Sequence, residues 1–250
     1  MQSACQSGVR RRRQSIMFQY EKAWQAVRSR MARATLASGR EPDSVRLVAV
    51  SKTVPADAVR ALYALGQRDF GENYVQEGAA KVASLSDLTD IRWHLIGPLQ
   101  SNKTALAASS FAWIETIDRE KIATRLSAAR ANGMPPLDVC IQVNVSGEAS
   151  KSGIEPDRAV TFATSVAAMP RLRVRGVMGI PEPTPDVGVR RARFRRLREC
   201  FEACRAAGLA MDTLSMGMSA DLEDAIAEGA TVVRVGTAVF GARPGRNLTR

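Results

Sequence analysis

The chain has 250 residues, of which 45% are hydrophobic, 24% are charged and only 5% are aromatic. This composition is typical of a globular protein. It excludes collagen-like and disordered chains, and the lack of an apolar run of about 18 residues excludes a membrane span. The formal net charge of +11 makes nucleic acid the first partner to test. Part of that charge is one terminal run at 10–13, and the basic stretches lack the interleaved aromatic residues that stack on bases. We therefore expect no nucleic-acid partner and no association with a membrane.

The basic residues are divided unevenly, into 6 lysines and 30 arginines. Because Arg supplies the positive charge almost everywhere, each Lys is expected to have a chemical role that Arg does not fill. The cysteines form no C-x-x-C pair, and Cys200 and Cys204 lie one helical turn apart, which favours packing over metal binding. We expect no structural zinc and no disulfide framework, and hence a reducing, cytoplasmic compartment.

The N-terminal segment is polar and basic, and it has no apolar region of the kind that precedes the cleavage site of a secretory signal. We expect residues 1–17 to form a disordered basic extension, which a translation start at Met17 would remove. Residues 18–250 are expected to form one domain. It begins with a helix between Tyr20 and Gly39, where apolar residues recur at helical spacing.

Strand and helix signals then alternate along the chain. The Val-rich run at 46–52 predicts a buried strand, and Pro55 begins a helix that ends at Gly66. Amphipathic helical stretches recur, for example at 119–131 and 156–169. Seven further strands are predicted, at 68–71, 92–96, 112–116, 138–145, 172–180, 212–216 and 232–236.

Strands without polar alternation, separated by helices, indicate a parallel sheet that is covered on both faces. Eight of them in 250 residues predict an α/β protein, a single (β/α)8 TIM-type barrel with an extra N-terminal helix. A doubly wound open sheet is the alternative. In a barrel of this type, chemistry gathers where the strands end. The residues at these ends are Lys52, Glu72, Asn73, His94, Asn144, Met178, Gly179, 215–219 and 234–237.

Lys52 closes the first predicted strand. An amine there is partly desolvated, which lowers its pKa and frees the lone pair for attack on an aldehyde. Arg cannot form the resulting Schiff base, so a Lys at this position of an Arg-rich chain fits the chemistry. A solvated charge at the end of a strand is the alternative. Lys103 and Lys151 also lie in predicted strand-end loops and are rival nucleophiles.

The segment from Arg234 to Thr237 follows the eighth strand and has the features of an anion site. Gly236 allows an anion to approach the backbone closely, and Thr237 offers a hydroxyl. Ser219 lies where the next helix is predicted to start, and the free N–H groups of a helix start bind phosphate. The loops after the seventh and eighth strands commonly hold phosphate in this barrel, so a phosphorylated ligand is predicted. Ser219 as a helix N-cap is the alternative, and the two roles are compatible.

His94 lies within the apolar segment 93–97. It is either a base or a hydrogen-bonded core residue, and its place in a buried strand favours the core. Neither a Ser/His/Asp order nor a close pair of carboxylates stands out, so a hydrolase has no candidate site.

Sequence motifs cover most of these strand ends: Ala49-Val-Ser-Lys52, Phe70-Gly-Glu-Asn-Tyr74, Trp93-His-Leu-Ile-Gly-Pro-Leu-Gln-Ser-Asn-Lys103, Gln142-Val-Asn144, Lys151-Ser-Gly153, Gly176-Val-Met178, Met216-Gly-Met-Ser219 and Arg234-Val-Gly-Thr237. Taken in this order, the chain resembles the pyridoxal 5′-phosphate homeostasis proteins, a family similar to the N-terminal domain of alanine racemase. The resemblance runs from about residue 20 to Arg243. Leu95 stands where Phe is usual, and the segment before about Met17 has no counterpart in the family.

This resemblance implies a fold-type III barrel that holds pyridoxal 5′-phosphate as an internal aldimine on Lys52. By the same likeness, Arg234 faces the pyridine nitrogen, Ser219, Gly236 and Thr237 hold the phosphate, and Asn73 lies near the ring. No metal and no catalytic residue are expected. An Arg beside the pyridine nitrogen disfavours its protonation, because two positive charges would meet, and an unprotonated ring is a weaker electron sink.

The function that follows is a non-catalytic carrier or buffer of pyridoxal 5′-phosphate, expected to be a monomer, that delivers the cofactor to pyridoxal-phosphate-dependent apoenzymes. The chain ends at Arg250, just beyond the barrel, which leaves no room for the second domain that supplies a racemase with its opposite base. The main alternative is an amino-acid racemase or lyase on the same cofactor. A third is a Schiff-base aldolase that uses no cofactor.

Overall fold

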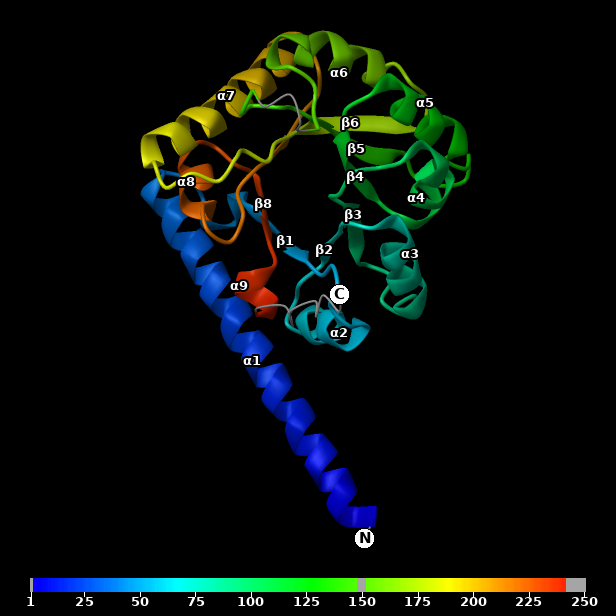
Figure 1. Cartoon of the computed structure of the whole chain (residues 1–250), viewed down its shortest axis with the longest axis vertical. Helices are drawn as coiled ribbons and strands as arrows, with labels where there is room; N and C mark the ends of the chain where they lie inside the picture. The colour runs from blue at the N-terminus through cyan, green and yellow to red at the C-terminus, as the bar shows by residue number, and fades with distance from the viewer. Residues whose placement is uncertain (1, 148–151, 242–250) are drawn as a thin grey trace, which may run out of the picture.

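The computed structural model describes the backbone of residues 2–147 and 152–241, and the side chains of 18–147 and 152–241. Within these ranges, eight parallel strands form one closed barrel in chain order. Figure 1 shows it ringed by helices. The strands are β1 (Arg46–Val50), β2 (Asp69–Glu72), β3 (Arg92–Leu95), β4 (Trp113–Ile117), β5 (Leu137–Gln142), β6 (Leu172–Met178), β7 (Thr213–Ser215) and β8 (Val232–Val235). All eight predicted strands are confirmed. The barrel is also confirmed, and the open sheet is wrong because β1 pairs with β8.

Helices follow the strands around the outside of the barrel, as the alternating sequence pattern predicts. They are α2 (Ala56–Ala64), α3 (Val75–Ser84), α4 (Thr104–Ser110), α5 (Glu120–Ala129), α6 (Ala159–Ala167), α7 (Val187–Ala206), α8 (Leu222–Ala227) and α9 (Thr237–Phe240). Short 3-10 segments are η1 (Pro42–Ser44), η2 (Ser101–Lys103) and η3 (Pro156–Arg158). Pro55 lies at the N-cap of α2. Cys200 and Cys204 are buried in the hydrophobic core, as the packing interpretation expects.

Two separate layers of side chains stabilise the barrel. The outer layer is a continuous core between strands and helices, in which Phe70, Ile114 and Leu126 are fully buried. The inner layer is much smaller and includes Trp113 and Cys140, with Met178 beside them. These belong to β4, β5 and β6, and they fill the lumen of the barrel. Polar and charged side chains, including His94, Glu115 and Arg234, are also buried in the lumen.

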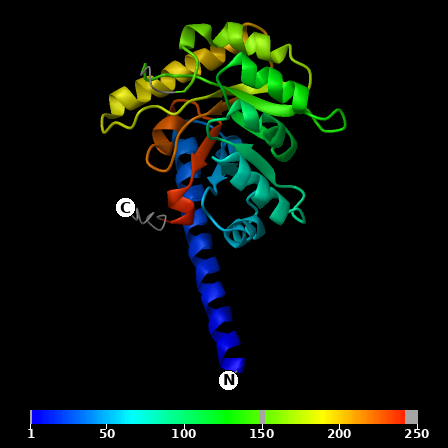
Figure 2. The same cartoon turned by 45° about the vertical axis from the view of Figure 1, so that its right-hand side comes forward.

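The extra N-terminal helix is present and is longer than the sequence analysis predicts. Helix α1 spans Gln2–Ala37, so the backbone of residues 2–17 is helical where a disordered extension is expected. This segment contains no proline and many good helix formers, such as Arg, Gln and Ala, so it continues the helix that follows it. Its first half projects away from the barrel in both views (Figures 1 and 2).

The second half of α1 packs on the barrel beside α2, α8 and α9. The indole of Trp24 donates a hydrogen bond of 3.0 Å to the Gln67 side chain, which in turn donates to the carbonyl of Leu47 on β1. These contacts join α1 to β1, and its packing against α8 and α9 joins it to the helices that flank β8. Among the described residues, no helix has both the length and the apolar content needed to cross a membrane.

Candidate functional site

The carboxyl ends of β1 and β8 bring the predicted amine and the predicted anion site to the same mouth of the barrel. Val48 pairs with Arg234 and Ala49 with Val235 in the parallel register, so Lys52 follows β1 where Gly236 follows β8. A Cβ placed on Gly236 would lie 3.3 Å from the carbonyl oxygen of Val50. The close approach of these two turns therefore favours Gly at 236. Lys52 itself is half-buried.

Arg234 lies in the barrel lumen, where its side chain is only 3% exposed. Its guanidinium donates to the Ser215 hydroxyl on β7 at 2.5 Å and to the carbonyl of Gly179 at 2.9 Å. The Glu115 carboxylate lies 3.8 Å away. Three segments of the barrel thus fix one cation in the lumen. Three of the predicted strand-end residues, Gly179, Ser215 and Arg234, are therefore in contact with one another through the guanidinium.

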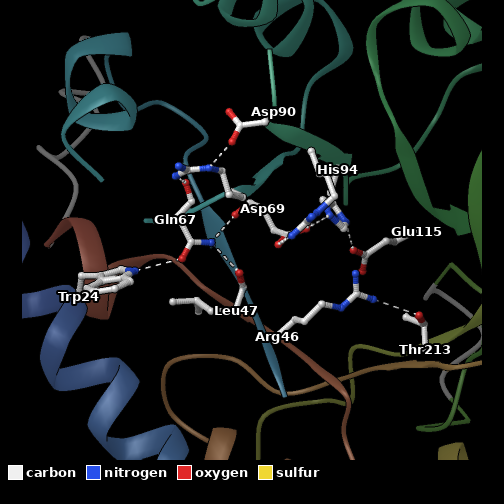
Figure 3. A network of polar contacts seen from close by, with 11 residues as sticks. Trp24, Arg46, Leu47, Gln67, Asp69, Asp90, His94, Glu115 and Thr213 are labelled. Carbon is white, nitrogen blue, oxygen red and sulfur yellow. Dashed lines mark hydrogen bonds and ion pairs between the residues drawn. The ribbon is translucent and has the colours of Figure 1, made fainter. Parts of the chain in front are cut away.

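A chain of buried charges continues from Arg234 through Glu115 and His94 to Asp69 at the opposite mouth of the barrel. Figure 3 shows its part from Glu115 through His94 to Asp69. Glu115 on β4 accepts from Ser215 at 2.6 Å and contacts Nδ1 of His94 at 2.7 Å. The other ring nitrogen of His94 lies 3.1 Å from Asp69, and Asp69 is held by two hydrogen bonds from Arg92. Because β4 and β7 are not neighbours in the sheet, the contact between Glu115 and Ser215 crosses the barrel.

The ionisation of this chain follows from its contacts. Burial disfavours the charged form of His94, but hydrogen bonds to Asp69 and Glu115 outweigh it and raise the pKa of the imidazole. Burial favours protonation of Glu115 and Asp69, but the cations beside them lower the pKa of each carboxyl. His94 also stacks on Trp113, with 5.1 Å between the ring centroids. His94 is therefore a hydrogen-bonded core residue, as the favoured interpretation predicts.

Ser219 is placed beside the start of α9. Its hydroxyl accepts a hydrogen bond of 3.4 Å from the backbone N–H of Ala238, one residue beyond Thr237. The loop after β7 and the turn after β8 therefore meet, as expected for the two parts of one anion site. The N-cap alternative for Ser219 is wrong, because α8 begins at Leu222 and its N-cap is Asp221.

Helix α1 contributes to this loop, a contact that the sequence patterns did not reveal. Arg30 donates to the carbonyl of Ser219 at 3.1 Å and holds both carboxylate oxygens of Glu223 at 2.7 and 2.8 Å. The two partners are more than 180 residues from Arg30 along the chain, at separations of 189 and 193. No local pattern predicts such a contact.

Asn73 follows β2 and is half-buried at the same mouth. Val50 pairs with Gly71 between β1 and β2, and Lys52 and Asn73 each lie two residues beyond that pair. A Cβ on Gly97 would lie 2.2 Å from the carbonyl oxygen of Asn73, so Gly97 lets the loop after β3 pack on the Asn73 backbone. Glu72, its neighbour in the sequence, contacts Lys81 of α3.

The remaining candidates lie elsewhere or have local roles. Lys103 is half-buried at the end of η2, just before α4, whereas Lys151 lies outside the described residues. Asn144 is buried, and its backbone N–H donates to the carbonyl of Ile154. Met178 belongs to the apolar lumen cluster. In the described ranges, no group of three His, Cys, Asp or Glu side chains is placed to hold a metal ion.

The donor set at the mouth suits a phosphorylated aldehyde that carries a basic ring. Lys52 supplies an amine, Arg234 a fixed cation below it, and Ser219 and Thr237 supply hydroxyls at a glycine-containing turn. An amine forms a Schiff base with an aldehyde, and hydroxyl and backbone N–H groups bind phosphate. Pyridoxal 5′-phosphate combines these groups, so the residues present fit it.

Comparison with known proteins identifies the family of the chain. The family model for the N-terminal domain of alanine racemase matches residues 25–244. The chain is 56% identical to a protein of Pseudomonas aeruginosa named pyridoxal phosphate homeostasis protein, over 87% of this chain and 93% of that one. It is 48% identical to the Escherichia coli protein of the same name, over 87% and 94% of the two chains.

Solved structures give the same result. PipY of Synechococcus elongatus with pyridoxal phosphate bound superposes with a TM-score of 0.74 at 40% identity, covering 84% of this chain and all of that one. Alanine racemase of Corynebacterium glutamicum shares the fold, with a TM-score of 0.62, but only 18% identity. The chain therefore belongs to the alanine racemase N-terminal domain family and, within it, to the pyridoxal phosphate homeostasis proteins.

Proposed function

We propose that this protein binds pyridoxal 5′-phosphate through Lys52 and acts as a carrier or buffer of the cofactor rather than as an enzyme. The observation that carries the proposal is the convergence of Lys52, Arg234 and the Ser219–Ala238 contact at one mouth of the barrel. The relatives named pyridoxal phosphate homeostasis proteins, and the PipY structure with the cofactor, support it. The bound cofactor supplies an aldehyde, which condenses with a primary amine and releases one water.

The chain's own residues would hold the cofactor at three points. Lys52 supplies the amine that joins the aldehyde carbon. Ser219, Gly236 and Thr237 receive the phosphate at the turn where Ser219 meets Ala238. Asn73, which follows β2 as Lys52 follows β1, would contact the ring.

Arg234 would set the electronic state of the ring nitrogen. Because Ser215 and the Gly179 carbonyl fix its guanidinium, the charge cannot easily move away from a ring placed above it. A fixed cation disfavours a proton on the nearby nitrogen, and an unprotonated ring withdraws electrons weakly from a bound amino acid. This supports reversible holding over carbanion chemistry.

The names of the relatives also support a carrier. The Pseudomonas aeruginosa and Escherichia coli relatives are both named pyridoxal phosphate homeostasis protein. An amino-acid racemase or lyase on the same barrel is the second candidate, which the shared family with alanine racemase keeps open. We further propose that the recipients are pyridoxal-phosphate-dependent apoenzymes and that the protein is a monomer.

The test is an absorbance spectrum of fresh protein, followed by intact mass before and after borohydride reduction. The expected result is one mass increment of a reduced, covalently attached cofactor in the wild type and none in Lys52→Ala. Lys103→Ala, which changes one of the two rival lysines, is the matched control and should retain the increment. A Lys52→Ala protein that still gains the increment would show that another amine is used. Rapid racemisation or cleavage of amino acids by the loaded wild type would favour the enzyme.

A further inference from the structure

Lys52 lies in a turn whose backbone is strained. Ser51 and Val54 are joined by a hydrogen bond of 3.0 Å from the Val54 N–H to the Ser51 carbonyl, which places Lys52 and Thr53 at the centre of the turn. Thr53 has φ of 62°, in the left-handed region. Gly or Asn usually occupies such a position, and a β-branched residue there is a genuine outlier. The surrounding structure must therefore supply what holds this conformation.

The contacts that hold the turn come from an ionic cluster formed by the buried Glu72 and Lys81 and the partly exposed Glu77. The Lys81 ammonium has three N–H donors and three acceptors: the Ser51 carbonyl at 2.7 Å, Glu72 at 2.7 Å and Glu77 at 3.3 Å. Its side chain is only 7% exposed, and that of Glu72 is fully buried. Helix α3 thus places the Lys81 ammonium, with all three N–H donors bonded, against Ser51, the residue before Lys52.

Both neighbours of Lys52 are held by this cluster. The Ser51 hydroxyl donates to Glu72 at 2.6 Å, in addition to the bond from Lys81 to the Ser51 carbonyl. On the other side, the Thr53 N–H donates to Glu77 at 2.5 Å. The residue with the strained φ is therefore the one whose N–H is bonded to Glu77.

Glu72 contains the one buried side-chain oxygen or nitrogen, within the described ranges, that lacks a hydrogen-bond partner. Its Oε1 accepts both bonds, whereas Oε2 has none. Both donors therefore meet at one oxygen, which ties the position of the Lys81 ammonium to that of the Ser51 hydroxyl. Gly78 makes the arrangement sterically feasible, because a Cβ there would lie 3.1 Å from the Cβ of Glu72 and 2.5 Å from the ring of Phe111.

The geometry points to Lys81 and Glu77 as positioning residues for Lys52: through Ser51 and Thr53 they hold the amine-bearing turn in the conformation that retains pyridoxal 5′-phosphate. This inference rests on the proposed attachment at Lys52. It also explains why one of the 6 lysines of this Arg-rich chain is at position 81. Three acceptors that converge on one point fit the compact ammonium of Lys, whereas the planar guanidinium of Arg spreads its donors apart.

The first arm of the test uses cofactor-free protein and measures amide hydrogen exchange by NMR. In Glu77→Ala the Thr53 N–H loses its acceptor, so its exchange should accelerate about tenfold, while amides of the strands keep their wild-type rates. Glu77 is partly exposed, so this variant leaves the buried pair of Glu72 and Lys81 in place. Unchanged exchange at Thr53 would overturn the inference.

The second arm measures release of pyridoxal 5′-phosphate. We expect the dissociation rate constant to rise about tenfold in Glu77→Ala and in Lys81→Met, which corresponds to about 1.4 kcal/mol. Lys121→Met, on an exposed position of α5, is the matched control and should release the cofactor at the wild-type rate. If Lys81→Met does not fold, the release rate of Glu77→Ala alone decides the outcome of this experiment. Release at the wild-type rate from every folded variant would overturn the inference.

A double variant separates positioning from general stability. Gly adopts positive φ without steric cost, so in Thr53→Gly the turn depends less on Glu77. The effect of Glu77→Ala on release should therefore be smaller in the Thr53→Gly background than in the wild type. Equal effects in both backgrounds would overturn the inference. If the wild type carries no cofactor on Lys52, the proposed function fails, whereas the exchange arm still decides whether the cluster holds the turn.

Discussion

Nδ1 of His94 lies 2.7 Å from a carboxylate oxygen of Glu115, and each of these side chains is only 1% exposed. This pair joins the cation expected below the cofactor ring to a carboxylate at the opposite mouth of the barrel. It also makes the stability of the lumen depend on proton binding, which gives two predictions that need no cofactor.

His94→Gln should destabilise the protein by about 3 kcal/mol near neutral pH, because it leaves the Glu115 and Asp69 carboxylates without the cation between them. The folded-state pKa of His94 is raised, so its contribution is fully present below the unfolded value of 6.5 and is lost as pH rises through the folded value. Urea unfolding of both proteins from about pH 6 to about pH 10 checks this. A difference that grows with pH would contradict it.

Asp69→Asn should show the opposite pH dependence. Burial raises the pKa of Asp69, but Arg92 and His94 outweigh it and lower the pKa below the ordinary value of 3.8 for an Asp. The ionised carboxylate therefore stabilises the fold above that pH, and the contribution is lost as pH falls through the folded-state pKa. We expect about 2 kcal/mol, because the Arg92 side chain is half-exposed and solvent screens the pair. The free-energy difference between wild type and variant should shrink on acidification below about pH 4. A constant difference would show that the pair contributes nothing.

Arg234→Gln should raise the proton affinity of the ring nitrogen of bound pyridoxal 5′-phosphate, since it removes the fixed cation from the lumen. Gln is preferred to Glu because Glu115 lies 3.8 Å from the guanidinium, and two carboxylates would repel there. The measurement is a pH titration of the bound chromophore. Arg40→Gln serves as the control, because Arg40 bonds to the carbonyls of Ile226 and Ala230, around the end of α8. A titration that matches the wild type would argue against the proposed contact.

Arg30→Ala should weaken binding of pyridoxal 5′-phosphate about threefold to tenfold, because the Ser219 carbonyl loses a charged hydrogen-bond partner. Pyridoxal, which lacks the phosphate, should bind equally well to both proteins. Arg28→Ala is the matched control on the same helix, since Arg28 pairs with the exposed Asp43. Equal losses for both ligands would place the effect outside the phosphate loop.

The sequence was most informative about the barrel. Runs such as Arg46–Val50 are apolar without alternation because both faces of each strand are buried, so strand positions are evident locally. It was least informative at the start of the chain, where composition suggested disorder and the backbone of 2–17 is helical. The exact start of α8 was also missed, because Asp221 and Ser219 are both good N-cap residues.

In the candidate site, residues at strand ends were predictable, whereas their supporting contacts were not. Lys52 and Arg234 follow from strand position and side-chain chemistry. Arg30 acts on a loop 189 residues away, and such contacts leave no local periodicity. Lys81 had one usable signal, since it is a Lys in a chain that otherwise prefers Arg, but only the fold shows that it contacts Ser51.

The pairing of β1 with β8 has a consequence for synthesis of the chain. The first strand ends at Val50, and the strand that completes its hydrogen bonding begins at Val232. During translation, one edge of β1 therefore remains unpaired until nearly the whole chain has been synthesised. A nascent or prematurely terminated chain contains Lys52 but not the turn after β8. Under the proposed attachment, only the completed chain would therefore bind pyridoxal 5′-phosphate.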